Sequence, residues 1–127
     1  MNSLTASALR DYKRRARALK CIGFSRYEDY LASELWAEIR AERLTEDPEC
    51  YGCAMPATQV HHVTYEVGVL LGTLSRSELR QKLRTVCKEC HESSEYFCGV
   101  KVGPKEATAL LEKRRRLREE RNHGHQF

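Results

Sequence analysis

The chain has 127 residues, which is enough for one domain or for one small core with helical arms. Charged residues make up 31% and the hydrophobic set 41%, an ordinary soluble composition in which no apolar run is long enough to span a membrane. The formal net charge of +4 favours nucleic acid as a partner without identifying it. No apolar leader is visible at the N-terminus, so the expected location is the cytoplasm.

The first half of the chain has helical periodicity. Residues 4–22 are predicted to form one helix, because Leu9, Tyr12, Ala16 and Leu19 recur at helical spacing. The run Ser25-Arg26-Tyr27-Glu28 is a capping-box pattern that opens a second helix to about residue 44. The apolar stripe of this second helix is predicted to comprise Tyr27, Leu31, Leu35 and Ile39. Tyr30 and Trp36 flank the stripe and are also predicted to be core residues.

The second half mixes strand and helix signals. Residues 59–65 are rich in strand formers, and a loop that contains Gly68 and Gly72 is expected to follow. A second capping box at residues 75–78 opens a short helix, and another helix is expected directly after Cys87. The last helix begins near Pro104, a residue that suits a first helical position, and runs to about residue 121.

These elements predict an α+β fold in three parts. A helical N-terminal arm takes residues 1–48, a cysteine-rich core takes residues 49–99, and a basic C-terminal helix and tail take residues 100–127.

Four of the six cysteines form two matched pairs, Cys50-x2-Cys53 and Cys87-x2-Cys90. Two thiolates at this spacing reach one ion from a tight turn, and a second pair completes a closed tetrahedral shell, as in structural zinc sites. A closed shell predicts that this Zn²⁺ stabilises the fold and performs no chemistry. Cys21 and Cys98 have no partner at that spacing and are predicted to be small, buried or partly buried thiols.

Three histidines and a glutamate lie at informative distances from the cysteine pairs. His61 and His62 are in the predicted strand after the first pair, whereas His91 follows Cys90 and Glu95 lies one helical turn later. An ion that joins the two pairs would therefore bring this strand beside this helix. Nitrogen and oxygen ligands together suit a divalent catalytic ion such as Mg²⁺, Mn²⁺, Ni²⁺ or Zn²⁺. Adjacent strand residues point to opposite faces, so His61 and His62 share a site only if the strand bends or bulges.

Three segments form a specific combination: Cys50-x2-Cys53, then Val60-His61-His62-Val63-x-Tyr65, then Leu83-x2-Val86-Cys87-x2-Cys90-His91. Together they resemble the HNH endonucleases of the four-cysteine type, over residues 50–96. The segment at residues 27–36 is similar to helical extensions of small HNH proteins from phages and prophages. The resemblance implies a ββα-metal (His-Me finger) core with a structural four-cysteine zinc site and flanking helices, in a bacterial or phage-infected cell.

The resemblance also implies an activity, the metal-dependent hydrolysis of phosphodiester bonds in DNA. By that resemblance His61 would ligate the catalytic ion, His62 would be the general base that activates water, and His91 would be a second ligand. Glu95 occupies the place of a third ligand, which is often histidine in the family. The family's asparagine is replaced by Lys82, which weakens the case for activity.

Basic residues crowd both ends of the chain, and beside a nuclease-like core they are predicted to contact DNA. The predicted nucleic-acid-binding residues are Arg14, Arg15, Arg17, Arg114, Arg115 and Arg116.

Two other functions compete with the enzyme. In the first, the zinc core is a catalytically degenerate scaffold for DNA binding. In the second, the protein blocks a partner protein through the acidic second helix. The acidic residues that motivate this reading are Glu28, Asp29, Glu34, Glu38, Glu42, Glu46, Asp47 and Glu49.

Overall fold

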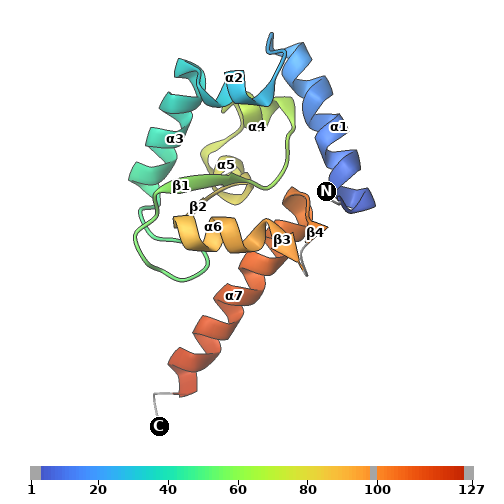
Figure 1. The fold of residues 1–127 in the computed structure, drawn as a ribbon. Helices are drawn as coiled ribbons and strands as arrows, with labels where there is room; N and C mark the ends of the chain where they lie inside the picture. Colours follow the sequence, from blue (N-terminus) through green and yellow to red (C-terminus); the bar gives the residue numbers. More distant parts are fainter. Residues whose placement is uncertain (1–3, 98–99, 125–127) are drawn as a thin grey trace.

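The computed structural model describes residues 4–97 and 100–124, and Figure 1 shows their arrangement. The fold is α+β, as predicted: helices surround a small antiparallel hairpin. Cys98 and residues 125–127 of the predicted tail lie outside the described residues. The first three helices are α1 (Ala6–Cys21), α2 (Tyr27–Leu31) and α3 (Glu34–Glu46).

The first helix confirms the prediction, but the second is divided. Residues 25–44 form α2 and α3 instead of one helix, with a break at Ser33. The Ser33 hydroxyl donates to Tyr30 O (2.6 Å) and accepts from Trp36 N (3.2 Å). One short side chain therefore satisfies the end of α2 and the start of α3, which makes a sharp corner more favourable than a continuous helix.

The loop predicted around Gly68 and Gly72 is wrong in part, because it contains the short helix α4 (Val67–Leu71). Gly72 ends this helix with φ 67°, and a Cβ at Gly72 would lie 2.9 Å from Ile39 Cγ1. Glycine here therefore permits both the left-handed cap and close packing on α3. The next capping box is confirmed: Ser75 Oγ accepts from Glu78 N at the start of α5 (Arg76–Lys82).

The centre of the molecule is the antiparallel hairpin of β1 (Gln59–His62) and β2 (Leu83–Val86), followed directly by α6 (Lys88–Ser94). Gln59 pairs with Val86, and His62 pairs with Leu83. Figure 1 shows α2 and α4 on one side of the hairpin and α6 and α7 (Pro104–Gly124) on the other. The sequence did not indicate the two-residue strands β3 (Tyr96–Phe97) and β4 (Val100–Lys101), which join α6 to α7.

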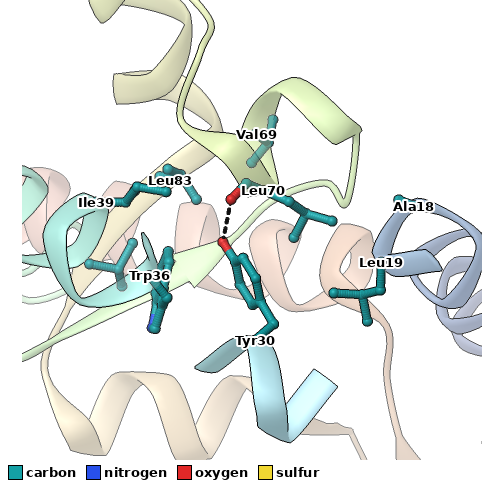
Figure 2. Packing of buried hydrophobic residues seen from close by; sticks show 9 residues of the cluster. Ala18, Leu19, Tyr30, Trp36, Ile39, Val69, Leu70 and Leu83 are labelled. Carbon is teal, nitrogen blue, oxygen red and sulfur yellow. Dashed lines mark hydrogen bonds between the residues drawn. The ribbon is translucent and has the colours of Figure 1, made fainter. Parts of the chain in front are cut away.

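Most buried apolar side chains form one cluster, which we call the aromatic cluster. Figure 2 shows Tyr30 in its middle, where the hydroxyl donates to Leu70 O at 2.7 Å. The predicted stripe on the second helix is wrong at Leu31, which is 41% exposed, whereas the core prediction for the flanking Tyr30 and Trp36 is confirmed, because both are buried. The buried members are Ala18, Leu19, Tyr30, Trp36, Ile39, Val60, Val69, Leu70 and Leu83.

A second, smaller cluster lies where the cysteine pairs meet α7, and we call it the cysteine cluster. Its buried members are Cys50, Val86, Cys90 and Leu111, with Tyr51, Cys53 and Cys87 packed against them. The hairpin contributes to both clusters, because β2 gives Leu83 to one and Val86 to the other.

Candidate metal centre and histidine pair

The four paired cysteines converge, as predicted, and are positioned to hold a metal ion. The Sγ atoms of Cys50, Cys53, Cys87 and Cys90 all lie within 4.8 Å of one another. The Sγ atoms of Cys53 and Cys87 are 3.7 Å apart. A tetrahedral shell with Zn–S bonds of about 2.3 Å has sulfur–sulfur edges of about 3.8 Å. Donor type, number and spacing are therefore consistent with structural zinc.

Local backbone geometry explains how each pair presents its thiols. The first pair turns back on itself through Ala54 N, which donates to Cys50 O at 2.9 Å, with Ala54 at φ 67°. Gly52 in the same turn leaves room for sulfur, because a Cβ there would lie 3.2 Å from Cys90 Sγ. The second pair begins α6, where Cys87 is the N-cap and its Sγ accepts from Cys90 N.

Helix α7 supplies positive charge to this centre. Arg114 Nη1 lies 3.2 Å from Cys90 Sγ, and Arg118 Nη1 donates to Gly52 O at 3.3 Å. Burial raises the pKa of the Cys90 thiol to about 12, and the Arg114 guanidinium opposes that rise. A nearby cation favours thiolate, the form that binds metal.

Cys21 lies outside this centre and is exposed, so the prediction of a buried or partly buried thiol is wrong for that residue.

His61 and His91 face each other across β1 and α6, with ring centroids 6.0 Å apart. Thr108 Oγ1 gives its only proton to Pro104 O, so His61 Nε2, 2.8 Å from that oxygen, is the donor and Nδ1 keeps a lone pair. Burial lowers the pKa of His61 to about 4, which keeps the ring neutral. His91 Nδ1 is hydrogen-bonded to Gln59 Oε1, an oxygen that only accepts. In a neutral His91 ring, Nε2 is therefore the nitrogen that carries the lone pair.

Each ring of the pair is thus held by one nitrogen while the other nitrogen stays free to accept a proton or bind an ion. Partners of this kind orient histidines that ligate metals. Glu95 is at the C-cap of α6, and its Oε1 lies 3.7 Å from His91 Nε2. Among the described residues, however, the four cysteines are the only set of three or more candidate ligands that converge within 4.8 Å. His61, His91 and Glu95 do not form a complete ligand set.

His62 lies on the other face of β1, as the alternation of a regular strand requires. Its ring lies against Trp36, with centroids 4.5 Å apart, and its Nδ1 is 3.2 Å from the Tyr27 hydroxyl. The side chain is 5% exposed, and burial lowers its pKa to about 3. His62 Nε2 is buried and has no hydrogen-bond partner in the described part of the chain. The structure therefore brings His61 and His91 together and directs His62 into the aromatic cluster.

Lys82, which stands where the HNH resemblance would expect asparagine, ends α5. Its carbonyl accepts from Val63 N at 2.8 Å, directly after His62, and its Nζ pairs with Glu66 Oε1 at 2.8 Å. The main chain of Lys82 therefore holds the end of β1, a contact that any residue type can make.

The arginines predicted to bind nucleic acid have different surroundings. Arg15 lies over the ring of Tyr27 at 4.0 Å and over that of Tyr12 at 4.6 Å, which binds α1 to the aromatic residues around His62. Arg14 and Arg17 line a mainly apolar cavity of about 800 Å³ between α1, residues 63–67 and the start of α7. On α7, Arg114 is engaged with Cys90 and Arg115 lies over Tyr51, while Arg116 is exposed.

No protein-family model matches the sequence, and no curated protein matches it. In the part of the chain that the structure describes, no helix combines the length and the apolar character needed to cross a bilayer.

Proposed function

We propose that the protein is a metal-dependent DNA endonuclease of the HNH type, built on a ββα-metal core with a structural zinc ion. The observation that carries the proposal is the order β1, β2, α6 with the four-cysteine centre at its base and His61 and His91 facing each other across it. Both rings keep one lone pair free because Thr108 and Gln59 fix the other nitrogen.

In this proposal the chain's own groups prepare the site for a phosphodiester. The rings of His61 and His91 lie with their centroids 6.0 Å apart, and Glu95 adds a carboxylate 3.7 Å from His91 Nε2. A divalent ion, when bound, stabilises the extra negative charge on the phosphate and the leaving oxygen. Because the three side chains do not yet converge, its ligand shell needs further ligands or a side-chain rearrangement.

The reaction also needs a general base. A general base must lie within hydrogen-bonding reach of the water that it deprotonates. His62 is buried against Trp36 on the face of β1 that points away from His61. This burial favours a second candidate, a catalytically degenerate zinc-scaffolded module that binds DNA without cleaving it.

A supercoiled-plasmid assay separates the two candidates. Purified protein is incubated with supercoiled plasmid and Mg²⁺, Mn²⁺, Ni²⁺ or Zn²⁺, with a chelator control. The nicked and linear plasmid products are then quantified. The endonuclease requires ion-dependent cleavage that His61→Ala and His91→Ala both reduce, by a hundred-fold or more if either residue takes part directly. Binding of DNA with no cleavage under any ion would establish the second candidate.

His62→Phe tests the base separately. Phenylalanine preserves an aromatic ring against Trp36 and removes the buried nitrogen that has no partner, so the fold should survive. A folded His62→Phe protein that binds DNA but does not cleave would identify His62 as the base. Cleavage at the rate of the natural chain would exclude that role.

A further inference from the structure

A groove rich in arginine lies between residues 47–51, the end of α5, β2 and α7. It has a volume of about 660 Å³. Its guanidinium groups belong to Arg43, Arg80, Arg84, Arg115 and Arg118. At one end the charges are already matched, because the Asp47 carboxylate lies 2.7 Å from Arg43 Nη2 and 3.2 Å from Arg80 Nη2.

The other end of the groove is built around Tyr51. Arg84 lies 4.0 Å and Arg115 4.6 Å from the centroid of this ring. Stacking on an aromatic face holds a guanidinium in place without consuming its hydrogen-bond donors. Two cations are thereby held next to one another, and their side chains are 18% (Arg84) and 42% (Arg115) exposed.

The carboxylates near these arginines hold them weakly. Arg84 is 3.6 Å from Glu112 and Arg115 is 3.1 Å from Glu119, and these glutamates are 41% and 52% exposed. Pairs with a carboxylate this exposed to water contribute little to stability. Arg118 has no carboxylate within 4.0 Å in the described residues. An incoming anion can therefore replace the glutamates.

The groove adjoins the histidine pair. Arg84 is the direct cross-strand partner of His61 in the β1–β2 hairpin, so the two side chains share one face of the sheet. From Glu112, beside Arg84, to Arg118, α7 rises by about 9 Å. One strand of DNA carries a phosphate for about every 3.4 Å of axis. The groove is thus long enough for about two or three consecutive phosphates.

We propose that this groove binds the phosphodiester backbone of DNA beside the His61–His91 pair. Arg84, Arg115 and Arg118 contact phosphates, and Tyr51 orients the first two. The assignment rests on the proposed function, because it makes the groove the path of the substrate strand. Free phosphate offers the same chemistry, so the test includes it.

Fluorescence anisotropy of a labelled duplex, measured across a salt series without added catalytic ion, tests the groove. Arg84→Gln, Arg115→Gln and Arg118→Gln should each weaken binding and reduce the salt slope by about one. Lys113→Gln removes one exposed positive charge from the same helix outside the groove, so it is the matched control and should change little. Tyr51→Leu should weaken binding, whereas Tyr51→Phe, which keeps the ring, should bind like the natural chain. Metal content is measured for every variant.

Several outcomes would overturn the assignment. Groove variants with full metal content that bind DNA with unchanged affinity and slope would do so, as would a natural chain that binds no DNA. Inorganic phosphate that displaces the duplex at equal phosphate concentration would make the groove a small-anion site. If the groove variants weaken DNA binding but the natural chain cleaves no plasmid, the groove assignment holds and the nuclease proposal fails. If the natural chain cleaves plasmid but the groove variants bind DNA normally, the nuclease proposal holds and the groove assignment fails.

Discussion

The aromatic cluster and the cysteine cluster show two ways in which a short chain stabilises its fold. In the aromatic cluster Tyr30, Val69, Leu70 and Leu83 are completely buried. A large apolar side chain contributes about 1.5–3 kcal/mol when fully buried, so this region has an extensive apolar core of its own. The cysteine cluster has only Val86 and Leu111 as buried apolar side chains besides its thiols. We therefore expect an ion held by those thiols to supply most of its stability.

The two adjacent histidines fall on either side of this division. His62 belongs with the aromatic rings, where it is neutral and packed. His61 faces α6 and α7, where it is held by Thr108 and lies near His91. A shift of one residue along β1 thus separates a side chain that supports packing from one that is available for chemistry.

The largest effect that this comparison predicts is loss of the cysteine cluster alone. Removing the metal with a chelator under reducing conditions, or changing Cys53 or Cys87 to Ser, should unfold the cysteine-rich core and release α7. Binding of structural zinc is worth about 10–16 kcal/mol, far more than the local packing. Trp36, the only tryptophan, reports on the aromatic cluster and should keep its buried fluorescence.

Elemental analysis and NMR spectra check this prediction, with the exposed Cys21→Ser as the matched control. A metal-free protein that retains every α6 and α7 resonance would show that the centre is not structural. If Trp36 becomes exposed together with the cysteine core, the two clusters form a single cooperative unit.

A smaller effect is expected in the aromatic cluster. His62→Ala should lower the free energy of unfolding by about 2–4 kcal/mol, because it leaves a cavity among Tyr27, Tyr30, Trp36 and Tyr65. His62→Phe should cost about 1–2 kcal/mol, because it keeps the ring but leaves the Tyr27 hydroxyl without its partner Nδ1. His91→Ala, whose side chain is 27% exposed, should cost less than about 1 kcal/mol. Urea unfolding followed by Trp36 fluorescence gives all three values. A His62→Ala protein as stable as the natural chain would mean that His62 does not pack as described.

Local patterns predicted the parts of the fold that depend on few residues. The Cys-x2-Cys spacing led to the metal centre because two thiols in one tight turn almost fix their own geometry. The starts of α5, capped by Ser75, and of α7, at Pro104, were likewise predicted from a few neighbouring residues. The corner at Ser33 was missed because the helical stripe continues through it, and only the packing of Tyr30 and Trp36 on the hairpin decides which face is buried.

The candidate site was harder to predict because it depends on partners far along the chain. Thr108 and Gln59, which orient His61 and His91, have no distinctive motif. The arginines on α7 looked equivalent in sequence, yet Arg114 contacts Cys90 and Arg115 stacks on Tyr51. Strand alternation did indicate that His61 and His62 would point apart, and the regular β1–β2 register explains why no bulge reunites them.

The smallest predicted effect tests how α7 supports the metal centre. A shell of four thiolates around a divalent ion carries two excess negative charges, and Arg114 places a guanidinium 3.2 Å from Cys90 Sγ. Loss of such an outer partner typically weakens metal binding by about 10–100-fold, and the exposure of Arg114 points to the lower end. Arg114→Gln should therefore weaken zinc binding about tenfold in a competition with a chromophoric chelator. Arg116→Gln removes the same charge two residues away, without contact to a thiol, and should change affinity less than twofold. Equal losses in both variants would mean that only the general charge of α7 matters. A loss of zinc affinity that is confined to Arg114→Gln and grows at low salt would establish the direct contact with the thiolate.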